Sequence, residues 1–302
     1  MLLKSKKTGE NNLLKIILSV TFVREEEKQI VNSLKEYDVE VVIMTEKNNH
    51  KLSYLQEFNL AIIRNLSQDM CLQRAKLFES LGIKCINTFD TIKICTDKLI
   101  QSNIFSNHNL PTPEFEAIFP ETTFPDLYNK FKTPFVIKPV NSSWGRGIVK
   151  IDSHNDFILW KEVSTSLDLK NQNYPYLAQE YIIKENYDIR ALVINNKIVG
   201  LFKRVSNNNW KTNTHLGAEI KPIEITEEIS DIINKISIIL PNAILGVDLL
   251  FDVSRQKYII CEVNNNPEFA KSSKIYKKNI GEIISEFVTK EPKNDKSEER
   301  LL

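Results

Sequence analysis

The sequence predicts an α/β (α+β) protein in which a small parallel α/β domain precedes two further domains. Strand-like and helical segments alternate up to about residue 95, and this alternation is typical of a parallel sheet. From residue 187 onward, strand-like segments dominate. Near the C-terminal end, two apolar runs flank the polar segment Asp252–Lys257, which predicts a β-hairpin.

Hydrophobic periodicity places the elements of the first domain. Strands are expected at 14–20, 39–44, 60–63 and 84–87, and helices at 25–37 and 68–81. Gly82 is expected to end the second helix, because glycine readily adopts the left-handed conformation that follows a helix. The segment has no G-x-G-x-x-G motif, so nothing in it indicates dinucleotide binding.

The second and third domains follow from the same patterns. Thr96 is expected to be the N-cap of a helix with Asp97 and Lys98 in its first turn, and Pro111 and Pro113 indicate an extended linker. Further strands are expected at 135–139, 148–151, 176–183, 189–194 and 197–205, and helices at 156–163, 227–240 and 281–289. The predicted domains are 1–95, 96–183 and 184–290, and the polar residues 291–302 are predicted to be a disordered tail.

Composition excludes several classes of function. The 302 residues carry a net charge of +1, with 42% hydrophobic and 26% charged residues, so no global field favours nucleic acid or an anionic membrane. The apolar run 13–23 contains Lys15 and is too short to span a membrane. The four cysteines form no C-x-x-C pair, which favours reduced thiols and a cytoplasmic location.

The predicted hairpin places acidic residues on one face. Pairing about a centre near Arg255 sets Asp248 opposite Glu262, and alternation puts Asn264 on the face of Glu262. Oxygen ligands facing one another suit a hard cation such as Mg²⁺, although a solvated face with acids pointing to water remains the alternative. Cys261 is expected on the opposite face, in the core.

Two further segments could contact phosphates. The loop Ser142–Gly147 has two serines and two glycines between strands, which is suited to presenting N–H donors to phosphate oxygens, although a plain hairpin turn is also possible. Lys138 lies on the strand that enters this loop and must find an anion or extend to solvent. Asp188 and Arg190 share a strand face, which suits either a site for a polyanion and a metal or a surface ion-pair ladder.

The ordered motifs resemble the ATP-grasp superfamily, and within it the RimK/LysX group of carboxylate–amine ligases, over about residues 14 to 288. In chain order the motifs are Asp97-Lys-Leu99, Val136-Ile-Lys-Pro139, Ser142-Ser-Trp-Gly-Arg-Gly147, Gln179-Glu-Tyr-Ile182, Asp188-Ile-Arg190, Trp210-Lys-Thr-Asn213, Gly246-Val-Asp248 and Glu262-Val-Asn264. Each motif alone is weak, and their ordered combination is specific. The resemblance implies a pre-ATP-grasp α/β domain followed by two domains that hold ATP between them.

The resemblance also implies roles for individual residues. Residues implied to contact the nucleotide are Lys98, Lys138, Ser142, Ser143, Trp144, Gly145, Arg146, Gly147, Gln179, Glu180, Tyr181, Ile182, Asp188, Lys211 and Asn213. Arg190 would face the transferred phosphoryl group as the catalytic residue. Asp248, Glu262 and Asn264 would hold Mg²⁺, with Mn²⁺ as a possible substitute.

The implied reaction is ADP-forming amide synthesis. A donor carboxylate, often a glutamate, attacks the γ-phosphoryl group of ATP, and an amine of an amino acid or peptide then displaces phosphate from the acyl-phosphate. The expected partners are ATP, amino-acid or peptide substrates, a small acidic carrier protein and a second copy of the chain, since a homo-oligomer is expected. Asn265 stands where LysX-type ligases usually carry His, so peptide or small-molecule ligation remains open. A small-molecule kinase and an inactive nucleotide-binding module are the alternatives.

Overall fold

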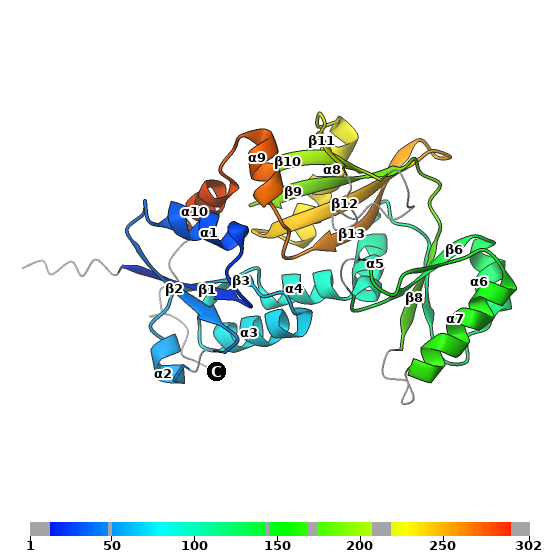
Figure 1. Cartoon of the computed structure of the whole chain (residues 1–302), viewed down its shortest axis with the longest axis horizontal. Helices are drawn as coiled ribbons and strands as arrows, with labels where there is room; N and C mark the ends of the chain where they lie inside the picture. The colour runs from blue at the N-terminus through cyan, green and yellow to red at the C-terminus, as the bar shows by residue number, and fades with distance from the viewer. Residues whose placement is uncertain (1–12, 48–49, 143–144, 168–173, 207–218, 291–302) are drawn as a thin grey trace, which may run out of the picture.

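The computed structural model describes residues 13–47, 50–142, 145–167, 174–206 and 219–290. Within these ranges it contains one parallel and two antiparallel sheets, arranged along the chain as Figure 1 shows. The predicted tail at 291–302 lies outside the described residues. No helix in the described ranges is long and apolar enough to cross a membrane.

The N-terminal sheet has the order β2-β1-β3-β4 and is parallel, as predicted. Its elements are β1 (Leu14–Val20), α1 (Glu25–Leu34), β2 (Val39–Thr45), α2 (Leu52–Leu55), β3 (Leu60–Arg64), α3 (Gln68–Ser80) and β4 (Lys84–Ile86). Ile16 and Ile17 are both fully buried, each in a different core cluster. Both faces of the sheet are therefore covered, which explains the continuous apolar run of β1.

Two helices of this region, α2 and α4, were not predicted, and the presence of α4 corrects the N-cap assignment. Helix α4 (Phe89–Thr96) begins after Thr88, whose side chain accepts a hydrogen bond from the Thr91 N–H. Thr96 is thus the last residue of α4. The N-cap of α5 (Lys98–Asn107) is Asp97, whose carboxylate accepts hydrogen bonds from the backbone N–H groups of Leu99 and Ile100 at 2.9 Å.

The middle sheet is antiparallel, with the order β5-β8-β6-β7. Its strands are β5 (Phe115–Ile118), β6 (Phe135–Pro139), β7 (Val149–Ile151) and β8 (Tyr176–Glu180), and its helices are α6 (Phe124–Phe131) and α7 (His154–Leu167). β5 and α6 were not predicted, and β8 ends three residues earlier than expected. An aromatic core that includes Phe135, Phe157 and Trp160 holds the helices against the sheet.

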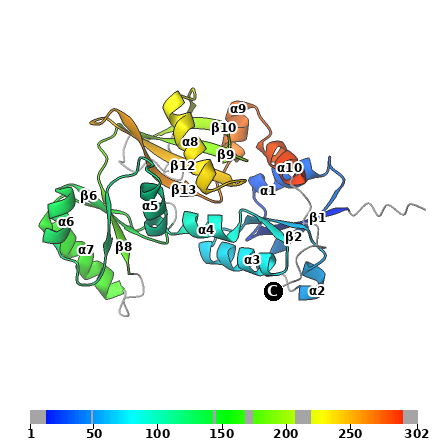
Figure 2. The same ribbon diagram turned by 180° about the vertical axis from the view of Figure 1, so that it is seen from behind.

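The C-terminal sheet has the order β11-β10-β9-β12-β13 and is also antiparallel. It comprises β9 (Tyr187–Ile194), β10 (Lys197–Val205), β11 (Glu219–Pro222), β12 (Ile244–Asp252) and β13 (Lys257–Asn264). Helix α8 (Glu227–Ile239) lies against one face of the sheet in Figure 2. It packs there through Ile229, Ile232 and Ile236.

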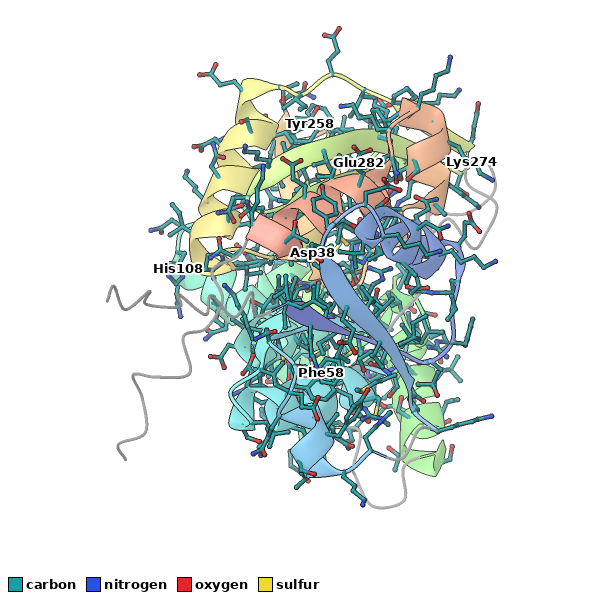
Figure 3. All side chains as sticks on the ribbon, turned by 90° about the vertical axis from the view of Figure 1, so that its left-hand side faces the viewer. Asp38, Phe58, His108, Tyr258, Lys274 and Glu282 are labelled. Carbon is teal, nitrogen blue, oxygen red and sulfur yellow. The ribbon has the colours of Figure 1, made fainter. Side chains whose placement is uncertain are left out.

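The last two helices lie next to the first helix of the chain. Helices α9 (Ala270–Tyr276) and α10 (Ile280–Lys290) lie beside α1 in the side view of Figure 3, which labels Lys274 and Glu282 on them. A Cβ at Gly281 would stand 2.6 Å from the backbone oxygen of Gln29. This close approach of α10 to α1 explains why glycine occupies that position and ties the two ends of the chain together.

Candidate functional site

The hairpin of β12 and β13 has the predicted register at Asp248 and Glu262. Strands β12 and β13 pair with Asp248 opposite Glu262 and Gly246 opposite Asn264. The Asn264 side-chain amide donates to Glu262 Oε1 at 3.3 Å. The carboxylates of Asp248 and Glu262 and the side-chain amide of Asn264 thus share one face of the sheet.

The predicted orientation of Cys261 is wrong because β13 contains a β-bulge. The pairing shifts between Asp248, which faces Glu262, and Leu249, which faces Ile260, so one residue of β13 is left over. Ile260 and Val263 both pack into the core under α8. Because the residues between them must then lie on the opposite face, Cys261 shares the face of Glu262 and does not enter that core. Burial raises the pKa of its thiol.

Two arginines and two aspartates form a buried network beside this face. Arg190 donates through Nε and Nη2 to Asp248, the second hydrogen bond measuring 2.7 Å. Arg204 donates to Asp188 at 2.6 and 2.8 Å, and its Nη2 lies 3.0 Å from Asp248 Oδ1. A Cβ at Gly246 would stand 3.0 Å from Arg190 Nη1, so this glycine leaves room for the guanidinium group.

The network fixes the charge state of its members. Burial alone would raise the pKa of Asp248, but the guanidinium groups of Arg190 and Arg204 outweigh it, so the pKa is lowered. Burial alone would lower the pKa of Arg204, but the carboxylates of Asp248 and Asp188 outweigh it, so the pKa is raised. Asp248 and Arg204 therefore stay ionised, and carboxylates hold both guanidinium groups in place.

Two further residues of the predicted site are buried lysines, Lys98 on α5 and Lys138 on β6. The space that they border together with Glu262 is called the cleft below. Lys98 is 8% exposed, donates to the Ser142 carbonyl oxygen and lies 4.0 Å from Glu262 Oε2. Burial lowers its pKa, an effect that Glu262 opposes and Lys138 adds to. Lys138 is 9% exposed, and among the described residues it has neither a hydrogen bond nor an ion pair. A buried ammonium group in that state favours an anionic ligand.

The segment 179–182, which the resemblance implies contacts the nucleotide, lies where the chain passes from the middle sheet to the C-terminal sheet. Arg255 forms an ion pair with Glu180, and the Val253 N–H donates to the Ile183 carbonyl at 2.9 Å. Gln179 is 3% exposed and donates to Ser102 Oγ at 3.2 Å, while its Oε1 is buried without a partner in the described structure. That oxygen could accept a hydrogen bond from a bound base. Tyr181 lies under Lys150 Nζ, 4.8 Å from the ring centre, and Ile182 is buried.

The expected phosphate loop is only partly described. Ser142 Oγ donates to the Pro139 carbonyl at 3.4 Å. Gly145 and Gly147 have φ of +69° and +70°, which favours glycine at both positions. Arg146 lies between these two glycines. Ser143 and Trp144, and likewise Lys211 and Asn213, lie outside the described residues.

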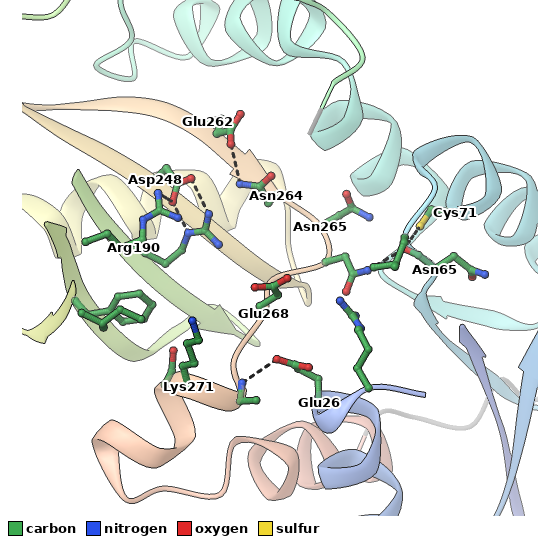
Figure 4. Close-up of a pocket in the computed structure, with 18 of the residues that line it drawn as sticks. Glu26, Asn65, Cys71, Arg190, Asp248, Glu262, Asn264, Asn265, Glu268 and Lys271 are labelled. Atoms are coloured by element: carbon green, nitrogen blue, oxygen red, sulfur yellow. Dashed lines mark hydrogen bonds and ion pairs between the residues drawn. The ribbon is translucent and has the colours of Figure 1, made fainter. Parts of the chain in front are cut away.

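A cavity of about 380 Å³ opens beside the arginine network (Figure 4). Its walls come from the start of α1, the segment that follows β3, the strands β9 to β13, and the segment from Asn264 into α9. The lining residues include Arg24, Glu26, Asn65, Leu66, Arg190, Phe202, Arg204, Asp248, Glu262, Asn264, Asn265, Asn266, Glu268 and Lys271. The N-terminal and C-terminal sheets therefore both contribute to this cavity.

Buried polar contacts fix the loop that follows β13. Asn87 donates to the carbonyl oxygens of Ile244 and Asn265, both at 2.8 Å. Glu26 accepts hydrogen bonds from the N–H groups of Phe269 and Ala270 at 3.3 and 3.0 Å. The cavity wall is thus positioned by side chains that lie far from it in the sequence.

Glu262 and Asn264 suit a hard cation such as Mg²⁺, whereas Asp248 is already engaged by Arg190. Among the described residues, no cluster of three or more His, Cys, Asp or Glu side chains is arranged to bind a metal. Glu262, whose side chain is 29% exposed, and Asn264 offer oxygen donors to the cleft. Both oxygens of Asp248 already accept hydrogen bonds from Arg190, so Asp248 could serve only as a shared ligand.

The structure also adds two residues that the sequence did not single out for the site. Arg204 joins Asp188 to Asp248, and Lys184 is a half-buried cation that donates to the Tyr187 carbonyl at 3.2 Å. Arg204 pairs directly with Asp188 across the β9–β10 hairpin. Counting from the turn residues Asn195 and Asn196 would instead pair Asp188 with Lys203, because the register shifts by one residue between Ile198 and Gly200.

Comparison with known proteins gives consistent matches. The RimK-like ATP-grasp domain family matches residues 95–288. The α-aminoadipate–LysW ligase LysX of Sulfurisphaera tokodaii is 33% identical over 89% of this chain and 96% of its own. The glutamate–LysW ligase ArgX of Sulfolobus acidocaldarius is 27% identical over 85% of this chain and 91% of its own. The crystal structure of a RimK domain ATP-grasp protein from Sphaerobacter thermophilus superposes with a TM-score of 0.72 at 16% identity, covering 91% of this chain and 99% of that one.

Proposed function

Because this chain belongs to the RimK-like ATP-grasp family, we propose that it joins the amino group of a small amino dicarboxylic acid to a glutamate carboxylate of a small carrier protein or peptide. The chain is an ADP-forming carboxylate–amine ligase of this family. The choice of substrates is the proposed part. It is supported by similarity to LysX and ArgX, whose names specify α-aminoadipate and glutamate with the carrier LysW.

The observation that carries the proposal is the shared wall between the cleft and the cavity. Arg190, Asp248, Glu262 and Asn264 all line the cavity, and Glu262 also approaches Lys98 on the nucleotide side. A carboxylate in the cavity and a phosphoryl group in the cleft could therefore meet at the same side chains.

The chain's residues support two successive displacements. The donor carboxylate attacks the γ-phosphoryl group of ATP to give an acyl-phosphate and ADP, and the amine then attacks the acyl carbon and releases phosphate with a proton. Arg190, braced by Asp248, would hold the phosphoryl oxygens in both steps. Lys98 and Lys138 would hold the nucleotide phosphates, with Gln179 accepting from the adenine. Mg²⁺ held by Glu262, Asn264 and a shared Asp248 oxygen would neutralise phosphate charge.

The cavity also offers charges for an amino dicarboxylic acid. Lys271 is exposed at the cavity and has no ion pair among the described residues, so it could bind a substrate carboxylate. Glu26 and Glu268 line the same cavity and could attract the substrate ammonium group. We propose that these side chains orient the amino group toward the acyl-phosphate.

The test is a product assay on the whole chain. The protein is incubated with Mg²⁺, ATP, either L-α-aminoadipate or L-glutamate, and an acidic peptide that ends in glutamate. The expected result is ADP release together with a product whose mass equals the peptide plus the amino acid less one water. A peptide ending in glutamine amide, which has no terminal carboxylate, is the matched control and should give neither.

Other outcomes would contradict the proposal. A phosphorylated product without an amide bond would indicate a kinase of the same fold. Nucleotide binding without ADP release for any amine and carboxylate pair would indicate an inactive binding module. ADP release that requires a free amino acid as the carboxylate donor would reject the carrier.

A further inference from the structure

Arg24 at the start of α1 is a largely buried cation that lines the cavity. It is the N-cap residue of α1, and its side chain is 15% exposed. Its Nε and Nη2 atoms donate to Glu27 at 3.0 and 2.8 Å. Among the described residues, no group accepts a hydrogen bond from its Nη1 atom. The guanidinium group is therefore fixed on one edge by Glu27 and has N–H donors left for a ligand.

Glu27 does not neutralise Arg24, because two arginines share its charge. Arg64 donates to Glu27 at 2.7 Å and to the Pro267 carbonyl oxygen at 3.2 Å. Of the three charged side chains in this group, Arg24 alone lines the cavity. The two arginines and one carboxylate together carry one positive charge, and Arg24 presents it to the cavity. A guanidinium group in that position favours a carboxylate ligand.

Two other cavity-lining carboxylates lie near Arg24. Glu26 and Glu268 both act electrostatically on Arg24. Glu26 already accepts hydrogen bonds from the N–H groups of Phe269 and Ala270, and Glu268 is exposed to solvent, which screens its charge. Charges of both signs at this end of the cavity suit an amino acid, which carries both signs itself, better than a simple anion.

Arg24 lies at the end of the cavity that is remote from the proposed reaction. In Figure 4, Glu26 at the same helix end lies across the cavity from Glu262, and Glu268 lies between them. Under the proposed function, the amine must reach the acyl-phosphate beside Arg190 and Glu262. The α-carboxylate stays close to the amine, because both are bonded to one carbon. The group of an amino dicarboxylic acid that can extend to Arg24 is therefore its side-chain carboxylate.

We propose that Arg24 is a specificity-determining residue whose guanidinium group binds the side-chain carboxylate of the amino dicarboxylic acid. This inference rests on the proposed function and deepens it, because it assigns recognition of the second carboxylate to a residue that lies before the family-matched region 95–288. Glu27 holds the guanidinium group in advance, so little side-chain freedom is lost on binding. An amino acid whose side chain ends in an uncharged amide leaves Arg24 without a counter-charge and should be rejected.

The experiment measures ADP release by the full chain with Mg²⁺, ATP and the acidic peptide that ends in glutamate. The amines are two matched pairs, L-glutamate with L-glutamine and L-α-aminoadipate with L-homoglutamine. The unsubstituted protein should use one of the two acids with a kcat/KM at least about a hundredfold above that of its amide. Arg24→Gln should raise the KM for that acid at least about tenfold, change kcat less than about threefold, and reduce the preference for the acid to below about tenfold. Arg24→Lys keeps the charge without the planar fork and should fall between the two.

Arg74→Gln is the matched control and should keep the full preference for the acid. Arg74 is a half-buried arginine of α3 that donates to the Thr45 carbonyl oxygen at 3.4 Å and does not line the cavity. Acid and amide are compared in the same sample, so partial unfolding of a variant cannot change the preference.

Three outcomes would overturn the proposal. The first is equal use of acid and amide by the unsubstituted protein, which needs no variant. The second is an undiminished preference in Arg24→Gln, and the third is a rise in the KM for the peptide in place of the KM for the acid. If neither acid supports ADP release by the unsubstituted protein, the proposed function on which the inference rests is wrong instead.

Discussion

Glu27 at the start of α1 should contribute strongly to stability, because it is the buried partner of two arginines. It is 0% exposed and accepts hydrogen bonds from Arg64 Nε at 2.7 Å and Arg24 Nη2 at 2.8 Å. Arg64 is itself 2% exposed and donates to the Pro267 carbonyl oxygen at 3.2 Å. Burial alone would raise the pKa of Glu27, but Arg24 and Arg64 lower it from 4.5 to about 2.

This lowered pKa sets the size and the pH range of the effect. A shift of that extent corresponds to about 3 kcal/mol of stability at neutral pH. Because the folded pKa lies below the unfolded one, the stabilisation is complete above pH 4.5 and is lost as the pH falls toward 2. Glu27→Gln should therefore lower the free energy of unfolding at pH 7 by roughly 3–5 kcal/mol, since it also leaves Arg64 buried without its full counter-charge.

Urea unfolding followed by circular dichroism at pH 7 and pH 3 measures this difference. The gap between the unsubstituted protein and Glu27→Gln should shrink by about 2 kcal/mol at the lower pH. Glu25→Gln is the matched control, since Glu25 lies in the same first turn with a 56% exposed side chain, and it should change stability little at either pH. If Glu27→Gln costs no more than Glu25→Gln, or if its cost is the same at both pH values, the electrostatic account of Glu27 is wrong.

Three further predictions concern the cleft and its loop. Glu262→Gln should abolish ADP release in a protein whose circular dichroism is unchanged, because it removes a proposed metal ligand and the partner of Lys98; full activity would reject that role. Arg190→Lys should lower kcat by about tenfold or more, since lysine cannot reproduce the two hydrogen bonds to Asp248. If calorimetry shows an equal loss of Mg·ADP affinity, Arg190 only binds phosphate and has no role in the chemical step. Gly82→Ala, with φ of +75° in open space, should cost about 1–2 kcal/mol on urea unfolding. Gly147→Ala should cost more, because its Cβ would also lie 2.7 Å from Pro139 Cγ; equal costs would contradict the clash.

The sequence predicted those features that depend on local alternation. The β1 and β10 bounds were predicted correctly, and the pairing of Asp248 with Glu262 is the one observed. The predicted orientation of Cys261 was wrong, because a bulge adds one residue to β13 without changing the hydrophobic character of the strand. A period of two therefore holds on each side of the bulge and fails across it.

Helix α4 was missed for a different reason. The segment Phe89–Thr96 mixes β-branched and aromatic residues with polar ones, and such residues have weak helix propensity. The helix is held by packing, since Ile92 is fully buried in the core of the N-terminal sheet. Once α4 is present, Thr96 is its last residue and the N-cap role passes to Asp97.

The cavity depends on contacts that no local pattern could reveal. The family match begins at residue 95, yet Arg24, Glu26 and Asn65 line the cavity from before that point. Asn87 holds the Asn265 carbonyl across 178 residues of sequence. Under the proposed function, the N-terminal sheet would therefore shape the wall that meets the second substrate, while the side chains proposed for phosphoryl transfer lie within the matched region. On this basis, changes of substrate among such ligases should be sought in α1 and the segment after β3 as well as in the matched region.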